Sequence, residues 1–255
     1  MWNDLKFSVR MLRQTPAFSL LAIFVIALGI GVNTAIFSLV NAVLFRPPAV
    51  KAPGELRYVY ANDGAYSGIL MYRHYQQLRD AADMFVDIVA VTQDEAKLGR
   101  GSGVRLAMGE AVSTNYFEVL GVVPTLGRPF AAAIDEAVGA QPAAIISHRM
   151  WVNDFNADPS VLGRTVSLTR RMVRPDRQSP VYTIVGVAPE GFDGVASPWS
   201  PTEFWVPLVQ RVTDARREGA DGVVRAPNPD DGPVRLCIGR LKAGRTSDEV
   251  RAFVA

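Results

Sequence analysis

The sequence contains one cysteine and two histidines, and this scarcity removes several classes of protein from consideration. A single thiol, Cys237, supplies neither an intrachain disulfide nor a cysteine-based zinc site. Its position inside an apolar stretch predicts a small core residue. His74 and His148 are far apart in the sequence, each in a segment with a helical pattern, and the neighbouring residues indicate no metal or catalytic role.

Nucleotide-binding motifs and a strong net charge are also missing. No glycine-rich stretch is followed by Lys-Ser or Lys-Thr, the pattern of a loop that binds ATP phosphates. Gly99–Gly103 has no such lysine and is predicted to be a loop. The net charge of +2 is too small to indicate a nucleic-acid partner. We therefore expect no bound cofactor and no contact with nucleic acid.

Catalytic side chains show no recognisable grouping. Ser102 and Ser147 lack the base and the orienting residue that a nucleophilic serine requires. Adjacent acids in loop-like surroundings are expected to be solvated; they are Asp135 with Glu136, and Asp230 with Asp231. The sequence thus predicts a protein that is not an enzyme, with no catalytic residue and no metal ligand.

Charge is absent from one long stretch, since no ionisable residue occurs between Arg13 and Arg46. About 20 apolar residues in a helix cross the hydrocarbon core of a bilayer, which is about 30 Å thick. Thr15 and Pro16 suit the start of a helix, and Arg46 followed by two prolines suits its end. Residues 16–46 are therefore predicted to form a transmembrane helix in a lipid bilayer.

A cleaved secretory signal is the alternative for this apolar stretch. Signal sequences have an apolar core of about 7–15 residues, and the stretch here is much longer. Val40–Ala42 has the small residues of a cleavage site but lies unusually deep in the sequence. These features favour a retained membrane helix.

The first fifteen residues have an apolar stripe at helical spacing. Residues 1–15 are therefore predicted to form an amphipathic helix on the cytoplasmic membrane surface. The stripe consists of Trp2, Leu5, Val9 and Leu12. Basic residues exceed acidic ones on this side of the span, which predicts a cytoplasmic N-terminus and a periplasmic location after residue 46 of an inner-membrane protein.

Small and weakly polar residues recur on one face of the predicted span. Such residues let membrane helices approach closely, and Thr or Asn can form hydrogen bonds across the contact. The predicted packing face consists of Ala27, Gly31, Thr34, Ser38, Asn41 and Ala42. An isolated anchor has no need of such a face, so it indicates partner helices.

Residues 47–255 have the patterns of a globular region in which helices and strands are mixed without regular alternation. This pattern predicts an α+β extracytoplasmic domain, and we divide it into two subdomains. Predicted strands are 56–60, 86–92, 104–112, 143–146, 164–172, 181–188, 204–208 and 234–241, and predicted helices are 70–80, 115–120 and 148–155. Residues 93–103 and 210–233, rich in Gly, Pro or charge, are predicted to be exposed loops.

An ordered set of motifs in this region resembles the periplasmic core domain of MacB-like permeases. Residues 28–37 also resemble the first membrane helix of that family, and the N-terminal pattern is similar to FtsX-like permeases encoded without a fused ATPase. The matching segments are 109–121 (GEAVSTNYFEVLG), 126–130 (LGRPF), 144–151, 163–166, 185–192, 204–208 and 239–244. Together they extend over nearly the whole chain.

The resemblance implies a permease subunit of a MacB/FtsX-type ABC transporter. In such a system an ABC-type ATPase subunit binds ATP in the cytoplasm, and motion passes through the membrane helices to a periplasmic domain that exports or releases a substrate. The implied partners are that ATPase and further permease helices, in a dimer. The alternative is a membrane-anchored module that binds or senses an extracytoplasmic partner without transport.

Two features depart from the family pattern. Relatives continue into three further membrane helices, whereas a capping box at Thr246–Glu249 opens a helix shortly before this sequence ends. We therefore expect an N-terminal, C-terminally truncated fragment. The turn after Arg170 is longer than usual in the family and contains Arg171, Arg174 and Arg177. Such a charged turn is expected to be a solvated loop tip, and a contact with an anion or a lipid headgroup is the alternative.

Overall fold

The computed structural model describes residues 16–44, 49–59, 70–81, 83–99, 103–136, 140–170, 181–197, 199–213, 217–218, 224–225 and 233–245. The chain divides into two compact units, Met1–Arg46 and Pro47–Ala255. Three predicted features lie outside the described residues. They are the amphipathic helix at 1–15, the arginine-rich turn at 171–177 and the capping box at 246–249.

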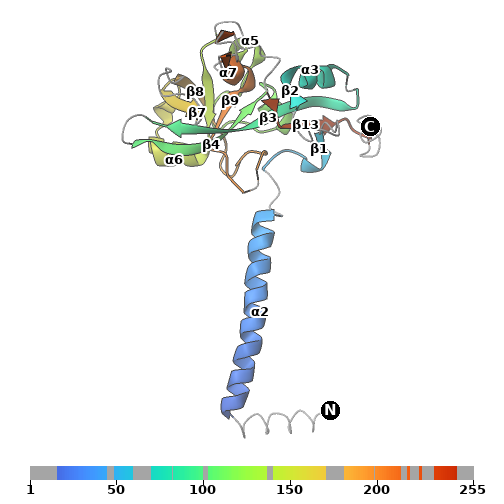
Figure 1. Ribbon diagram of the computed structural model, residues 1–255, viewed down its shortest axis with the longest axis vertical. Coiled ribbons are helices and arrows are strands. Elements are labelled where there is room, and N and C mark those ends of the chain that lie inside the picture. Colours follow the sequence, from blue (N-terminus) through green and yellow to red (C-terminus); the bar gives the residue numbers. More distant parts are fainter. Residues whose placement is uncertain are drawn as a thin grey trace. The chain divides into compact units, whose positions relative to one another are not determined.

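The described part of the first unit is one helix, α2, which comprises the 29 residues Pro16–Leu44 (Figure 1). Proline fits the first helical position because the N–H of that position has no partner inside a helix. Within α2, Pro16–Ser38 is long and apolar enough to cross a membrane by length and composition, with a mean hydropathy of 2.4. Its large side chains, for example Phe24 and Ile30, are exposed. These properties make α2 a candidate membrane span.

Nine strands of the second unit form one mixed sheet, in the order β1-β13-β3-β4-β9-β6-β8-β5, with β7 paired to β3 and β8. The β4/β9 and β6/β8 pairs are parallel, and the remaining pairs in this sheet are antiparallel. The strands are β1 (Leu56–Val59), β3 (Phe85–Leu98), β4 (Arg105–Val112), β5 (Leu126–Gly127), β6 (Ala143–Ile146), β7 (Thr165–Arg170), β8 (Val181–Val187), β9 (Phe204–Pro207) and β13 (Leu236–Leu241).

Short helices connect these strands, and small ladders border the sheet. The helices are α3 (Tyr72–Ala81), α4 (Tyr116–Leu120), α5 (Ala132–Asp135), α6 (His148–Phe155) and α7 (Leu208–Thr213), with 3-10 turns η1 (Pro53–Glu55) and η3 (Pro159–Val161). The ladders join β2 (Leu70–Met71) to β12 (Pro233–Val234), and β10 (Arg217–Glu218) to β11 (Val224–Arg225). The mixed sheet confirms the predicted α+β class.

The sheet carries a hydrophobic core on each of its faces. Neighbouring side chains of a strand point to opposite faces, so Val89 and Ala90 of β3 belong to different core clusters although both are fully buried. The first cluster includes Tyr75 of α3 and Met150 of α6. The second includes Phe117 of α4. Helices therefore cover both faces, which makes the unit a layered domain.

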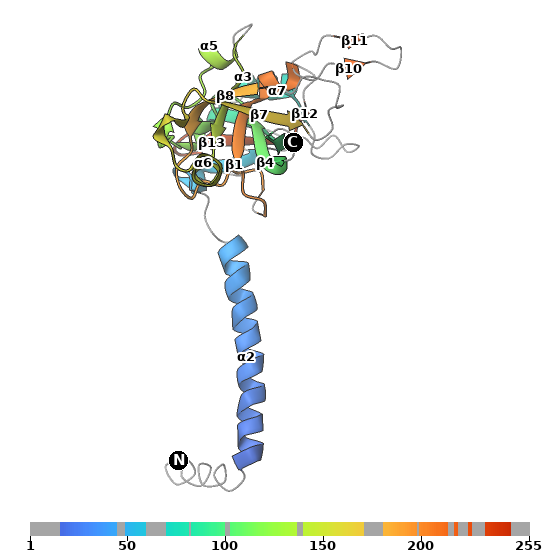
Figure 2. The same cartoon turned by 90° about the vertical axis from the view of Figure 1, so that its left-hand side faces the viewer.

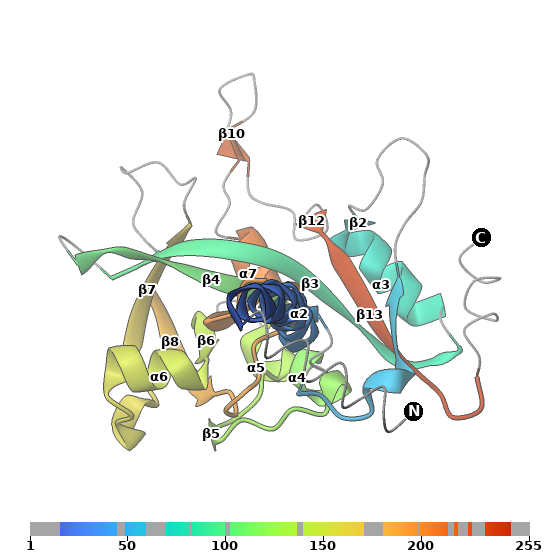
Figure 3. The ribbon, with the colours of Figure 1, turned by 90° about the horizontal axis from the view of Figure 1, so that it is seen from below.

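The long strand β3 joins the two ends of the sheet. Residues 85–91 pair with β13, residues 91–98 pair with β4, and residues 96–98 also pair with β7. Figure 3 shows β3 running across the unit as a single curved ribbon. One continuous strand is therefore hydrogen-bonded to three neighbours, β13, β4 and β7.

The predicted loop at 93–103 is wrong for residues 93–98, which continue β3. In this part of the strand Asp94, Ala96 and Leu98 are buried, whereas Gln93 and Lys97 are exposed. That alternation has the period of a strand with one buried face. The strand pattern was not recognisable in the sequence, because Asp94 occupies an inward position where an apolar residue is usual.

The predicted exposed segment at 210–233 is also wrong at its start. Helix α7 buries Gln210 and Arg211. The Gln210 amide donates to the carbonyl oxygen of Asp135 at 2.8 Å, and its oxygen accepts from the backbone N–H of Ala143 at 2.9 Å. Polar composition indicated solvent, but tertiary partners satisfy these groups inside the unit.

A buried ion pair connects α7 to β3. The Arg211 guanidinium donates to the Asp94 carboxylate, and the two side chains are only 3% and 6% exposed. Arg211 also donates to the carbonyl oxygen of Leu168 at 3.0 Å and to the hydroxyl of Tyr182 at 2.9 Å. These bonds tie α7, β3, β7 and β8 together at a buried site.

Replacing one member of this pair should destabilise the domain strongly. Asp94→Asn leaves the Arg211 charge buried without its counter-ion, which costs about 3–5 kcal/mol of the free energy of unfolding. The measurement is urea unfolding of the full chain in detergent. The double variant Asp94→Leu/Arg211→Met removes both charges and should recover most of the loss. Equal loss in the single and double variants would contradict a role for the charge pair.

Candidate functional site

The predicted packing face lies along α2. Ala27, Gly31, Thr34 and Ser38 are all exposed in the structure. The Thr34 hydroxyl donates to the carbonyl oxygen of Ile30 at 2.8 Å, so its own helix already accepts its hydrogen, and a partner helix could only donate to it. A Cβ at Gly31 would have no heavy atom within 4 Å.

Two members of the face, Asn41 and Ala42, lie in the backbone of α2, and their side chains are outside the described part of the structure. The four described residues nevertheless share one side of the helix, because their spacings of three and four residues match the helical period. The packing role of the face stays a prediction.

In the globular unit, the side chain of Glu110 is the most heavily hydrogen-bonded group among the described residues. Glu110 lies on β4, is 1% exposed, and belongs to the motif at 109–121. Its Oε1 accepts from the N–H of Val195 at 2.9 Å, the N–H of Ala196 at 2.8 Å and the hydroxyl of Thr202 at 3.1 Å. Its Oε2 accepts from the Tyr116 hydroxyl at 2.6 Å and the Trp205 indole N–H at 2.8 Å.

These bonds close the neck of the segment Asp193–Thr202, called the 193–202 loop below. The N–H of Thr202 donates to the carbonyl oxygen of Asp193 at 2.9 Å, which joins the two ends of the loop. Gly194 has a φ of +82°, and a Cβ there would overlap the Glu110 carboxylate. The loop therefore requires glycine at its neck, both for conformation and for space.

The surroundings of Glu110 hold the hydroxyl of its donor Tyr116 in the protonated form. Burial, followed by the negative charge of Glu110, raises the pKa of Tyr116 well above its usual value, so the hydroxyl remains a donor at physiological pH. The indole of Trp205 stacks on the ring of Phe192 with a centroid distance of 5.3 Å. Aromatic packing thus fixes the direction of the indole N–H toward the carboxylate.

Sequence reasoning included Glu110 only as part of a motif and assigned it no role. The available signal was a single acidic residue inside an otherwise apolar strand, Val104–Val112, apart from Arg105 at its start. A charge at an inward strand position requires partners. Which residues provide them was not visible, because three of the donors lie at positions 195, 196 and 202.

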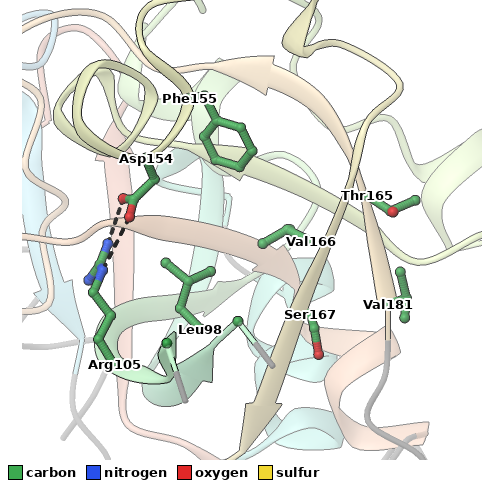
Figure 4. Close-up of a pocket in the computed structure, with 10 residues that line it drawn as sticks. Leu98, Arg105, Asp154, Phe155, Thr165, Val166, Ser167 and Val181 are labelled. Carbon is green, nitrogen blue, oxygen red and sulfur yellow. Dashed lines mark hydrogen bonds and ion pairs between the residues drawn. The ribbon is translucent and has the colours of Figure 1, made fainter. Parts of the chain in front are cut away.

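A hollow of about 420 Å³ lies between the ends of β3, β4, β7, β8 and α6 (Figure 4). Apolar side chains of Leu98, Phe155 and Val166 line it together with Arg105. The Arg105 guanidinium forms ion pairs of 2.7 Å with Asp154 and with Glu203. This volume is in the range of small-molecule sites, but the charged group on its wall is already neutralised.

The cysteine and the two histidines make contacts that belong to the fold rather than to a reactive site. Cys237 is buried in the core, as predicted, and burial raises the pKa of its thiol to about 12. His148 packs edge-on against Trp151 at a centroid distance of 5.4 Å. His74 lies on α3 and accepts from the N–H of Met71 at 3.4 Å. Among the described residues no three His, Cys, Asp or Glu side chains form a metal-binding group.

The expectation that Asp135 is solvated is wrong. Its carboxylate is 2% exposed and accepts two hydrogen bonds from Arg128, at 2.8 and 3.0 Å, and one from the N–H of Ala131 at 2.8 Å. Arg128 belongs to the motif at 126–130. A bidentate arginine compensates the buried carboxylate, which sequence adjacency to Glu136 did not indicate. The other acid pair, Asp230 with Asp231, lies outside the described residues.

A family model for the MacB-like periplasmic core domain matches residues 19–253. The chain belongs to this family. The match includes most of α2 and the globular unit, and confirms the resemblance seen in the motifs. The family is a component of ABC transporter permeases rather than a classical enzyme. No curated protein is detectably similar in sequence.

Solved structures of this family have the same fold. The periplasmic region of MacB from Actinobacillus actinomycetemcomitans aligns with a TM-score of 0.53 and 12% identity over 84% of this chain and 86% of that chain. The extracellular domain of the noncanonic ABC-type transporter YknZ from Gram-positive bacteria aligns with a TM-score of 0.51 and 17% identity over 78% and 86%. Identities this low support similarity of fold, and the MacB-like domain tolerates wide sequence divergence.

The Glu110 hydrogen bonds should determine the stability of the MacB-like domain. Glu110→Gln introduces an N–H₂ group that faces N–H donors in either orientation of the amide, so at least one buried donor loses its acceptor. The expected loss is about 2–4 kcal/mol in the free energy of unfolding. Glu118→Gln, an exposed site on α4, is the matched control and should change it by less than about 0.5 kcal/mol. Urea unfolding monitored by tryptophan fluorescence measures both, and equal effects would refute the assignment.

Proposed function

We propose that this chain is a permease subunit of a MacB/FtsX-type ABC transporter, or the N-terminal part of one. In this role an ABC-type ATPase hydrolyses ATP in the cytoplasm, and the resulting motion passes through membrane helices to the periplasmic domain, which exports or releases a substrate. The observation that carries the proposal is the family match, which extends from the apolar helix into the globular unit.

The membrane arrangement follows from the charge distribution. Residues 1–15 form the cytoplasmic interfacial segment, residues 16–46 the span, and residues 47–255 the periplasmic domain. By the positive-inside rule, Lys6, Arg10 and Arg13 support a cytoplasmic N-terminus in an inner-membrane protein. The apolar side chains of α2 are exposed along Pro16–Ser38, which suits contact with lipid and with other helices.

Two features of the domain support a mechanical role. Strand β3 carries pairing along its 14 residues, and the Asp94–Arg211 pair ties α7 to it. A displacement applied at one end of such a sheet is transmitted rather than absorbed, because close-packed interiors deform little. The packing face of α2 would receive the motion from partner helices, in a dimer with further permease helices.

Orientation is tested by a reporter fusion. Alkaline phosphatase fused after Arg46 should be active, because the enzyme folds only outside the cytoplasm, whereas the same enzyme fused after Gln14 should be inactive. Phosphatase activity of whole cells, normalised to the amount of fusion protein, is the measurement. The reverse pattern would place the globular domain in the cytoplasm and end the export proposal.

The packing face is tested by Gly31→Leu, with Gly29→Leu as the matched control. A Cβ added at either glycine would meet open space, but two residues of helix place the two positions on nearly opposite sides. Gly31→Leu should weaken co-purification with a second tagged copy or with the partner ATPase about tenfold, equal to about 1.4 kcal/mol, within the range of membrane helix contacts. Gly29→Leu should leave it unchanged, and neither variant should alter membrane insertion.

Equal co-purification of the two variants would contradict the packing face without affecting the family assignment. A chain that inserts normally yet binds neither a second copy nor an ATPase would favour the alternative function. In that case the chain is a membrane-anchored binding module, and the hollow at β7 and β8 is its candidate ligand site.

A further inference from the structure

The 193–202 loop presents an exposed tryptophan beyond a hydrogen-bonded neck. Trp199 is 69% exposed, whereas the neck of the loop is held by Glu110 through Val195, Ala196 and Thr202. Pro201, which follows Trp199 by two residues, restricts the backbone of the tip. An exposed indole on a preordered loop is poorly explained by folding alone, because exposure of a large aromatic side chain gains no burial energy.

The loop lies on the side of the globular unit where its first described residues, 49–55, are found. Val50, in this first segment, and Val195 and Ala196, in the loop, pack against the same core cluster. Figures 1 and 2 show the segment before β9 projecting from the side of the unit where residues 49–55 lie. A second exposed apolar side chain is near that segment, since Val123 is 78% exposed and Gly121 lies against Lys51.

Chain length keeps residues 49–55 close to the bilayer if α2 spans it. A helix of 29 residues is about 43 Å long, which equals the thickness of a bilayer with its headgroup layers, about 40–45 Å. Five Cα–Cα steps separate Leu44 from Ala49, so these residues are at most about 18 Å apart. Ala49 therefore stays within that distance of the headgroups.

We propose that the 193–202 loop inserts Trp199 into the headgroup region of the periplasmic leaflet, as a second contact of the domain with the membrane. Tryptophan prefers this region, where its ring meets apolar chains and its N–H meets water or headgroups. Residues 194–202 contain no charged side chain, so the tip enters without moving an ion out of water.

This proposal rests on the membrane anchoring proposed above and deepens it. A protein partner is the competing occupant, but the short connection to α2 keeps Ala49, on this face, near the bilayer with or without a partner. A lipid contact at this face requires no component beyond the anchored chain itself.

The test is tryptophan quenching in the full chain, reconstituted in vesicles of phosphatidylcholine and phosphatidylglycerol. All variants contain Trp2→Phe, and the emission lost on adding Trp199→Phe is the signal of Trp199. The other indoles are shielded, since Trp205 is buried and Trp151 is half-buried with its N–H bonded to the carbonyl oxygen of Asp158. Lipids brominated near the carbonyl end of their chains quench only indoles in the bilayer, in either orientation of the protein.

We expect brominated vesicles to remove most of the Trp199 signal and aqueous iodide to leave it nearly unchanged. Ile134→Trp, in the Trp2→Phe/Trp199→Phe background, is the matched control. Ile134 is 57% exposed on α5, which lies on the far side of the unit from residues 49–55 (Figures 1 and 2). Its indole should be quenched by iodide and not by brominated lipid.

Three outcomes overturn the proposal and are distinguishable. Trp199 quenched by iodide alone shows a solvated loop, and Trp199 shielded from both quenchers shows a protein contact. In either case, a chain that stays in the membrane fraction during alkaline carbonate extraction is still anchored, so only the loop contact is refuted. Release of the chain by carbonate refutes the anchoring itself, and with it both the loop contact and the proposed function.

Discussion

The Glu110 carboxylate lies inside the globular unit and accepts five hydrogen bonds from donors on α4, on β9 and at both ends of the 193–202 loop. A carboxylate buried without partners would be prohibitively unfavourable, so each donor has to be delivered to within about 3 Å. That requirement positions all of these segments relative to β4. The face of the sheet that holds the aromatic cluster depends on this one charged group.

The opposite face of the sheet also contains a buried carboxylate with a partner. There Asp94 forms an ion pair with Arg211 that joins α7 to β3. Buried ion pairs add little net stability compared with apolar residues, but a wrong arrangement leaves a charge without its partner. Two such sites, one on each face, tie connecting segments to the sheet. The family match extends from the apolar helix into this domain. Our membrane-contact proposal depends on the same Glu110 bonds, because they hold the neck of the 193–202 loop.

Local patterns were sufficient to predict the strands 143–146 and 204–208 and the helix 148–155 closely, because each has an uninterrupted apolar pattern and clear start or stop residues. The same reasoning predicted the helix that ends near Leu44 and the core position of Cys237. It failed at residues 93–98 and 210–211, where a strand and a helix contain charged residues that face inward. A prediction from periodicity assumes that charged side chains face solvent, whereas charged side chains in these two segments face the core.

By itself, the sequence determined the apolar helix, the mixture of helices and strands, and the family, because these depend on runs of residues that are adjacent in the chain. Only the tertiary structure decided the roles of Glu110, Asp94 and Asp135. Each of these carboxylates is stabilised by donors that local periodicity does not identify, and for Glu110 and Asp94 those donors lie on distant elements. The exposure of Trp199 was likewise visible only in the tertiary structure.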